Sequence, residues 1–280
     1  MKNGIMDLEK LLWARNYHLK NGCLPRMSFW DKKMYLSNIM LLGAGSNFAA
    51  AGNTHSIDLE RDLSQYLTAA DSASLSITGD ITIECWAKAE SAAPNNDTMT
   101  LVSKLATVSN NHSFIFYFED DAGTDYLYFA YSDDGTSADT AITRSRITHT
   151  QSVGSWVHYA VAVTVATQVV DFYVNGTNTT GTNTLTGGTS IFDSTALFAI
   201  GGGNQNGNST FFDGLIDDVR IWATKRTTAQ IQDNRSKELV GNETNLNGYW
   251  KLNNNLDDAT ANNNGLTNNG TAVFSTVVPF

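Results

Sequence analysis

Short runs in which apolar and polar residues alternate make up most of the chain from about residue 57 onward. In the run DITIECWAKAE (80–90), every second residue is apolar: Ile81, Ile83, Cys85 and Ala87. A period of two places these side chains on one face of a β-strand. Similar runs, bounded mostly by Asp, Gly or Asn, are TLVSKL, SFIFYFED, DYLYFAYSDDG, WVHYAVAVTV, VVDFYV and ALFAIGGG. This pattern predicts an all-β fold, an antiparallel two-sheet sandwich or jelly roll.

Two local signals predict a tight turn and a helix. The run VVDFYV ends at Asn175-Gly176, and Asn-Gly is a strong signal for a β-hairpin. After Trp222, Thr227 or Thr228 is suited to cap a helix formed by AQIQDNRSKELV. The sequence therefore predicts one short helix in the C-terminal part of the chain.

The run FFDGLIDDVRIW (211–222) carries two adjacent aspartates inside an apolar strand. Strict alternation places Asp218 on the same face as Arg220, with which it can pair. Asp217 then lies on the opposite face. That face is otherwise apolar, with Leu215, Val219 and Ile221. Because burying an unpaired carboxylate is costly, Asp217 needs either backbone N–H donors at a β-bulge or a bound cation.

The N-terminal segment differs in composition from the rest of the chain. Residues 1–50 contain seven Lys or Arg and three Asp or Glu, a net charge of +4. Residues 51–280 contain eleven and twenty-five, a net charge of −14. Five of the six methionines also lie within residues 1–40. We interpret residues 1–56 as an N-terminal arm and linker, and residues 57–280 as a jelly-roll domain.

The arm has the pattern of an amphipathic helix, with Asp7 placed to cap it and an apolar stripe of Leu8, Leu11 and Leu12. Two interpretations stay open. In the first, the segment is a start-site extension or a disordered arm. In the second, it is an arm that docks on a neighbouring subunit of an assembly. No run has the pattern of a secretory signal, and IMLLGAG (39–45) is too short to span a membrane.

Net charge and cysteine content narrow the partners and cofactors. The formal net charge of the chain is −10, which argues against a nucleic-acid partner. The two cysteines, Cys23 and Cys85, are too few for a zinc site. Whether they form a disulfide with each other is left open by the sequence.

Five segments occur in a characteristic order and spacing. They are SQYLTAADSASLSITGDITIECWAKAES, WVHYAVAV, DFYVNG, LFAIGG, and FFDGLIDDVRIW followed by a short helix. Together these segments resemble the laminin-G-like branch of the concanavalin A-like lectin/glucanase jelly rolls, and the resemblance covers about residues 57–280. It implies two curved antiparallel sheets packed face to face. It also implies that calcium at the rim, and glycan or protein partners, are to be expected, because several members of the family have them.

The segment LNGYWKLNNNLDDATANNNGLTNNG resembles one that often opens a laminin-G-like unit, but here it comes last. We interpret Gly248–Leu252 as a closing strand that is followed by an Asn-rich loop. The strand either completes this sandwich or pairs with a neighbouring copy. The first alternative is favoured because an exposed edge strand promotes aggregation.

No pattern of catalytic residues stands out. Retaining glycoside hydrolases need two carboxylates about 5–5.5 Å apart, and the E-x-D-x-x-E strand usual for hydrolases of this fold is absent. The cluster Glu119-Asp120-Asp121 is typical of a solvated turn, and His158 of a structural strand histidine. The run GGGNQNG (201–207) is not followed by G-K-[ST], so we interpret it as a turn. The protein is therefore predicted not to be an enzyme.

Calcium is the favoured cofactor among those considered. It binds six to eight oxygen ligands from carboxylates, amides and backbone carbonyls. If the Asn-rich closing loop folds over the strand 211–222, these ligands are expected to come from Asp217, Asp218, Asp257, Asp258 and Asn264. The alternative is that Asp218 pairs with Arg220 and that Asp217 accepts backbone hydrogen bonds at a bulge.

These observations favour a non-enzymatic structural or binding module. The first hypothesis is a surface or decoration protein of a phage or virus particle, which joins other subunits through its N-terminal arm and attaches to a host surface or glycan. The second is a secreted or cell-surface lectin-like adhesion module, and a glycoside hydrolase is the third. The expected location is the virion surface or the extracellular space. Tyr126, Tyr128 and Tyr131 are candidates for sugar stacking, although aromatic residues fill sandwich cores equally well.

Overall fold

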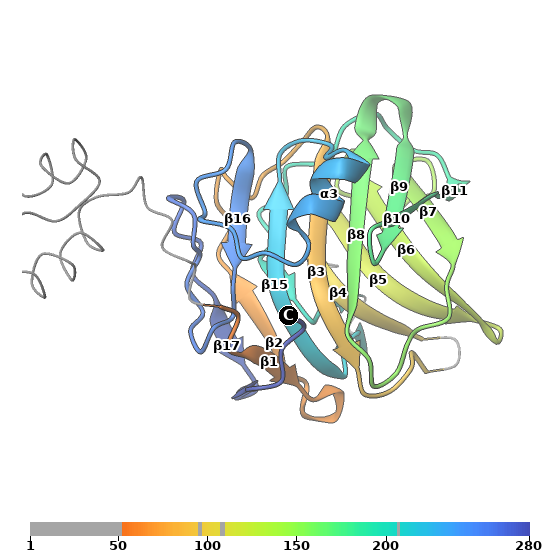
Figure 1. The fold of residues 1–280 in the computed structure, drawn as a ribbon. Helices are drawn as coiled ribbons and strands as arrows, with labels where there is room; N and C mark the ends of the chain where they lie inside the picture. The colour runs from red at the N-terminus through yellow and green to blue at the C-terminus, as the bar shows by residue number, and fades with distance from the viewer. Residues whose placement is uncertain (1–51, 95–96, 107–109, 206–207) are drawn as a thin grey trace, which may run out of the picture. The chain divides into compact units, whose positions relative to one another are not determined.

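The computed structural model describes residues 52–94, 97–106, 110–205 and 208–280. These residues belong to one compact unit, Gly52–Phe280. Two β-sheets pack face to face within it, and the only α-helix among the described residues lies over the outer face of one sheet (Figure 1). The fold is therefore the predicted two-sheet sandwich.

The first sheet has eight strands. They are β1 (Ser56–Leu59), β3 (Ile81–Ala89), β8 (Val157–Thr164), β9 (Val169–Val174), β10 (Thr177–Thr180), β15 (Gly214–Trp222), β16 (Leu246–Trp250) and β18 (Val273–Ser275). Their order is β10-β9-β8-β3-β15-β1-β18, and β16 pairs with β15. All of these pairings are antiparallel.

The second sheet has ten strands. They are β2 (Tyr66–Ala69), β4 (Thr98–Ala106), β5 (Asn111–Asp121), β6 (Thr124–Ser132), β7 (Ile142–Thr148), β11 (Thr182–Leu185), β12 (Phe198–Ile200), β13 (Asn204–Gln205), β14 (Asn208–Ser209) and β17 (Thr267–Asn269). Their order is β11-β7-β6-β5-β4-β12-β2-β17, with β13 joined to β4 and to β14. Pairs along this path are antiparallel. In chain order the strands alternate between the two sheets several times, as from β1 to β2 and from β2 to β3.

The core lies between the two sheets and is filled by the inward face of each strand. The residues predicted for the inward face of β3 are all in this core: Ile81, Ile83, Cys85 and Ala87. The inward face of β5 contributes Phe114, Phe116 and Phe118. Burying this apolar surface is the main favourable contribution to the stability of the fold.

The outer face of the eight-stranded sheet is covered by α3 (Thr228–Asn234) (Figure 1). Thr227 caps this helix, because its side chain accepts the Gln230 N–H while the Gln230 side chain accepts the Thr227 N–H. Ile231 packs beneath the helix in an apolar cluster on β8 and β9. The remaining helices are the short 3-10 turns η1 (Arg61–Leu63) and η2 (Val165–Thr167).

Several local predictions are confirmed. Asn175 and Gly176, both with positive φ, form the turn between β9 and β10. The helix begins at the predicted cap but ends at Asn234, earlier than the segment AQIQDNRSKELV would allow. The closing strand is present as β16, and it completes this sandwich by pairing with β15. Residues 1–51 of the predicted arm and linker (1–56) lie outside the described residues, so the domain boundary at residue 57 stays a prediction.

Candidate functional site

The outer face of the ten-stranded sheet carries an apolar cluster of its own. This cluster follows from the alternation of side chains along β5 and β6, because Phe114, Phe116 and Phe129 point into the core and their neighbours point outward. Its buried members are Leu105, Ile115, Tyr117, Tyr128 and Ala130. Most of these side chains also line a pocket, and a pocket with an apolar lining is a candidate binding region.

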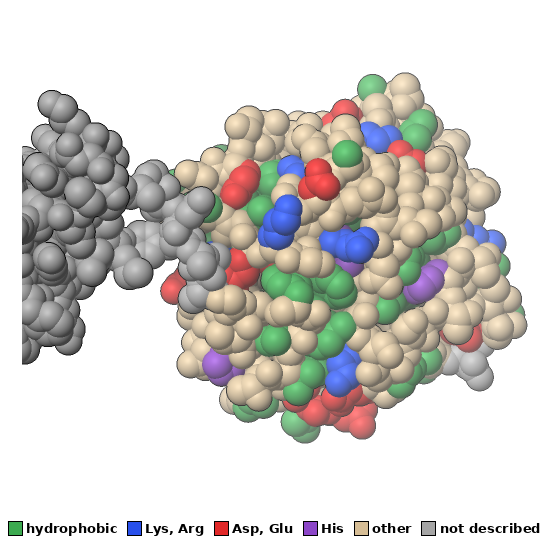
Figure 2. Space-filling model, viewed as in Figure 1, with side chains coloured by type: hydrophobic (Ala, Val, Ile, Leu, Met, Phe, Trp, Pro, Cys, Tyr) green, Lys and Arg blue, Asp and Glu red, His purple; other side chains and the backbone are tan. Residues whose placement is uncertain are grey.

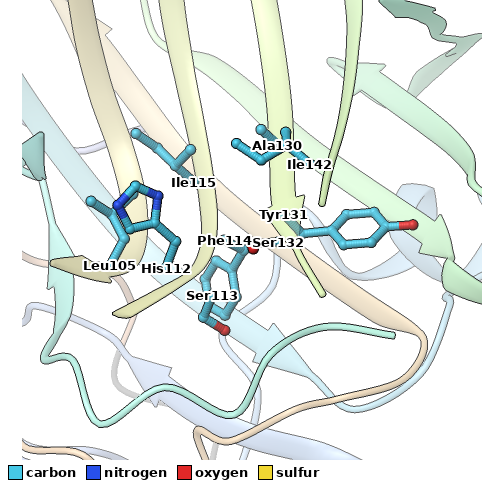
Figure 3. A pocket seen from close by; sticks show the side chains of 9 residues that line it. All are labelled: Leu105, His112, Ser113, Phe114, Ile115, Ala130, Tyr131, Ser132 and Ile142. Atoms are coloured by element: carbon cyan, nitrogen blue, oxygen red, sulfur yellow. The ribbon is translucent and has the colours of Figure 1, made fainter. Parts of the chain in front are cut away.

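A pocket of about 200 Å³ opens in this face, and we call it the Ala130 pocket. On the neighbouring strands, Ile115 and Arg144 lie opposite Ala130, while Tyr117 lies opposite Tyr128. The side chain of Ala130 is a single methyl group, whereas that of Tyr128 is a ring, so the outer face of the sheet has a depression at Ala130. The aliphatic and aromatic lining consists of Leu105, Ile115, Tyr117, Ala130, Ile142 and Leu185. Figure 3 shows a smaller adjoining pocket of about 40 Å³, which shares five lining residues with the Ala130 pocket: Leu105, His112, Ile115, Ala130 and Ile142.

The rim of the Ala130 pocket is polar and consists of His112, Ser137, Asp139 and Arg144. Arg144 donates from Nε to the Thr184 hydroxyl at 3.1 Å. The other nitrogens of Arg144 and the side chains of His112, Ser137 and Asp139 form no hydrogen bond with another described residue. Burial lowers the pKa of His112, which keeps the imidazole neutral near pH 7, with one donor and one acceptor. The rim therefore offers both donors and acceptors to a ligand.

Aromatic and arginine side chains form one wall beside the pocket. The rings of Tyr117 and Tyr128 stack with their centroids 5.1 Å apart. The Arg146 guanidinium lies 3.9 Å from the ring centroid of Tyr126, donates to the Tyr128 hydroxyl at 2.6 Å and pairs with Asp121 at 3.2 Å. These contacts hold the wall in one arrangement without a ligand.

A β-bulge changes the predicted facing of Asp217. The register of β15 against β3 shifts between Asp217 and Arg220, and Asp218 has a φ of 50°. Since the bulge adds one residue, Val219 and Ile221 return to the core while Asp217 lies on the other face. The prediction that Asp217 shares an apolar face with Val219 and Ile221 is therefore wrong.

Both oxygens of the Asp217 carboxylate accept hydrogen bonds. Oδ1 accepts the Asp218 backbone N–H at 2.8 Å, and Oδ2 accepts the Asn53 side-chain N–H at 2.6 Å. The interpretation that Asp217 takes a backbone hydrogen bond at a bulge is thus confirmed. The predicted pairing of Asp218 with Arg220 is also confirmed.

A buried ionic network lies beneath α3 and includes residues that the sequence did not mark. The Arg220 guanidinium contacts Asp218 and lies 3.7 Å from Glu84 Oε1. Glu84 also accepts the Trp222 indole N–H at 2.8 Å and lies 3.3 Å from His158 Nε2. Burial alone would raise the pKa of Glu84, but the His158 hydrogen bond and the Arg220 charge lower it to about 2. His158 therefore has a structural role, as predicted.

Asp217→Asn is expected to make the free energy of unfolding less sensitive to pH. Burial raises the pKa of Asp217 from 3.8 to about 8. The folded state thus resists ionisation of this group, and the wild type loses stability as pH rises from about 4 to 8, by at most about 1.4 kcal/mol per unit. The gain from Asp217→Asn grows over that window and is constant above pH 8. Denaturant titrations of both proteins at pH 5 to 9 measure it.

The new amide can keep both hydrogen bonds. The Asn53 side-chain oxygen is buried without a hydrogen bond, so a rotated Asn53 amide can accept from the introduced Asn. Parallel stability curves for the two proteins would contradict an elevated pKa at Asp217. The variant Asp233→Asn, on an exposed side chain of α3, controls for the loss of one charge.

The remaining predicted calcium ligands lie in the closing loop. Asp258 is buried, and its carboxylate accepts the backbone N–H groups of Tyr249, Thr260 and Asn264. The Asn264 side-chain oxygen accepts the Ser72 hydroxyl at 2.7 Å. Asp257 is exposed. Asp258 and Asn264 meet, because the Asn264 amide donates to the Asp258 carboxylate at 3.0 Å.

The five predicted ligands do not fit one shared calcium site in this arrangement. The carboxylates of Asp217, Asp218 and Asp258 are engaged by N–H and guanidinium donors, whereas a cation needs these oxygens as ligands. No three of the four aspartates bring their oxygens within 4.8 Å of one another. Calcium binding by this set stays a prediction.

A different acidic group was not predicted. The carboxylates of Asp58, Glu60 and Glu90 lie within 4.8 Å of one another, and no other group of this kind occurs in the described part of the chain. Burial and neighbouring carboxylates raise the pKa values of Asp58 and Glu60. Figure 2, which views the molecule from the side of the eight-stranded sheet and α3, shows Asp and Glu side chains gathered at the lower edge. No motif marks this group, because its residues come from β1 and the end of β3.

Other residues singled out in the sequence have structural roles. The prediction that Glu119-Asp120-Asp121 form a solvated turn is wrong, because these residues end β5 and Asp120 is buried. Asp120 accepts the Gly123 N–H at 2.8 Å and so holds the turn that follows the strand. Tyr131 lies in the core, whereas Tyr126 and Tyr128 face outward. Cys85 is a free, fully buried thiol whose pKa is raised by burial, and Cys23 lies outside the described residues.

Comparison with known proteins supports the fold. A family model for the concanavalin A-like lectin/glucanases superfamily matches residues 61–232. Two solved structures share the fold. One is a Bacteroides ovatus protein described as a candidate carbohydrate-binding protein, with 18% identity and a TM-score of 0.61 over 81% of this chain and 60% of that one. The other is a heptameric SAP-like pentraxin from Limulus polyphemus, with 14% identity and a TM-score of 0.55 over 81% and 97%.

This chain thus spans about three fifths of the Bacteroides protein. A comparison with curated proteins finds no match. Within the described residues, no helix has the length and apolar character needed to cross a membrane.

Proposed function

Because the chain belongs to the concanavalin A-like lectin/glucanase superfamily, we propose that it is a non-enzymatic binding domain that takes up a glycan in the Ala130 pocket. The observation that carries this proposal is the combination of an apolar floor with a polar rim, in which His112, Ser137 and Asp139 form no side-chain hydrogen bond with another described residue. A sugar ring has the complementary form, since its C–H groups lie on the ring faces and its hydroxyls at the edge. Ligand sites commonly combine an apolar lining with a few oriented polar groups.

Two further points support the proposal. A protein of the same fold from Bacteroides ovatus is described as a candidate carbohydrate-binding protein. Two of the carboxylates near the pocket are engaged, because Asp121 pairs with Arg146 and Glu119 hydrogen-bonds with Tyr117. Asp139 is then the one carboxylate among the lining residues of the pocket, and it has no second carboxylate beside it in that lining. A glycoside hydrolase would instead need two accessible carboxylates that converge on one bond.

Ala130→Trp is expected to weaken glycan binding at least about tenfold, equal to ~1.4 kcal/mol, because the indole fills the pocket. Val169→Trp is the matched control, since it adds the same side chain at an exposed position of β9 in the other sheet. The measurement is a glycan array with the full chain, followed by titration of the best ligand. Equal binding by wild type and Ala130→Trp would contradict the Ala130 pocket as the site.

The finer role is also a proposal. A surface protein of a phage or virus particle would use this pocket for attachment to a host glycan and its basic, Met-rich residues 1–50 for assembly with other subunits. A secreted or cell-surface adhesion module would use the same pocket. Deleting residues 1–51 distinguishes these roles, since only the first requires the arm for incorporation into a particle.

A further inference from the structure

We propose that the Ala130 pocket selects an uncharged sugar ring and discriminates against acidic sugars such as uronates. This inference rests on the proposed glycan-binding function and adds the class of ligand. It follows from the size of the pocket, the nature of its floor and the balance of charge on its rim.

The size of the pocket limits the ligand to a small ring. Its volume of about 200 Å³ is below the roughly 300–1,000 Å³ of sites that enclose drug-sized ligands. The floor at Ile115, Ala130 and Ile142 is purely aliphatic. A floor of this kind accepts the C–H face of one ring, while the rest of an oligosaccharide extends over the sheet surface.

The rim carries one cation and one anion. Arg144 supplies N–H donors and Asp139 supplies a carboxylate acceptor, and neither forms a salt bridge with another described residue. A sugar hydroxyl both donates and accepts, so hydroxyls can satisfy both groups. A ligand carboxylate can only accept, so it would pair with Arg144 and leave Asp139 facing a like charge.

The surroundings reinforce this preference. The positive charge of Arg144 interacts with the Glu119 carboxylate. Burial raises the pKa of Glu119, and the charge of Arg144 partly counteracts this effect. Residues 51–280 carry a net charge of −14, which repels anions at long range. A ligand without hydroxyls would bury the rim without hydrogen bonds, which is unfavourable for polar groups. Neutral sugars meet all three conditions, because their hydroxyls can satisfy the rim, they place no like charge beside Asp139, and the negative domain does not repel them.

The test compares ligands that differ only at one carbon. The full chain is titrated with oligosaccharides that end in glucose or glucuronate, and in galactose or galacturonate. We expect the wild type to bind a neutral member at least about tenfold more tightly than its acidic partner. Asp139→Lys should shift this ratio towards the acidic member. Asp233→Lys changes the net charge equally from an exposed position on α3 and should leave the ratio unchanged.

The outcomes separate this inference from the proposed function. Tighter binding of the acidic member, or equal ratios in Asp139→Lys and Asp233→Lys, overturns the selection of uncharged sugars but leaves a glycan site. Binding that persists in Ala130→Trp, or binding to no member of the panel, overturns the proposed function itself and this inference with it.

Discussion

Replacing Arg220 with methionine is expected to lower the free energy of unfolding by about 3–5 kcal/mol, the range for breaking a buried ion pair on one side. The side chain is fully buried and contacts Asp218 and Glu84, which are also buried. It also donates to the backbone carbonyls of Asn234 at 3.0 Å and Lys237 at 2.6 Å. Methionine keeps much of the volume, but it removes the positive charge beside two buried carboxylates and leaves two backbone carbonyls without their donor.

Urea denaturation measures this loss, and two further variants identify its cause. Arg146→Met breaks the half-exposed pair with Asp121 and is expected to cost less than about 1 kcal/mol. Adding Asp218→Asn and Glu84→Gln to Arg220→Met removes the stranded charges and should restore part of the stability. A loss for Arg220→Met as small as that for Arg146→Met would contradict the buried network as a major stabilising feature.

The fold could be predicted because its signals are local. Alternation in DITIECWAKAE, the Asn175-Gly176 turn and the Thr227 cap each depend on a few adjacent residues, and all three are confirmed. The facing of Asp217 was wrong because a bulge at Asp218 interrupts the period of two. A single signal was available, since aspartate tolerates the left-handed conformation that Asp218 adopts.

The candidate site was harder to predict because the pocket arises where a side chain on the outer face of the sheet is small. Tyr126 and Tyr128 were recognised as candidates, but the pocket is created by Ala130, whose small side chain carries no chemical signal in the sequence. Its rim combines His112 of β5 with Asp139, which lies in the loop between β6 and β7. Strand register across β5, β6 and β7 brings these residues together, and Leu185 joins them from β11, which pairs with β7. The pairing of strands that are distant in the sequence is not readable from one sequence.

Asp258→Ala is expected to destabilise the protein by roughly 3–5 kcal/mol, because it leaves several buried donors without an acceptor. The carboxylate accepts the N–H groups of Tyr249 at 3.1 Å, Thr260 at 2.9 Å and Asn264 at 2.9 Å, and it also binds the Thr260 hydroxyl. These bonds tie the closing loop to β16. Asp258→Asn should cost nearly as much, since its amide would turn a donor towards the Asn264 N–H. The exposed neighbour Asp257 provides the control, and Asp257→Ala should change stability by less than about 0.5 kcal/mol.

Melting temperatures with and without calcium distinguish the two roles considered for Asp258, which are a calcium ligand and a hydrogen-bond acceptor. If the set that includes Asp217, Asp258 and Asn264 binds calcium, the wild type should melt at a higher temperature in millimolar calcium than in chelator, because an ion bound only to the folded state stabilises it. Asp258→Ala would then remove this difference as well as the stability. Equal melting temperatures in the wild type would overturn the calcium prediction. The loss in Asp258→Ala would then be due to the hydrogen bonds alone, which are already sufficient to satisfy both oxygens of this carboxylate.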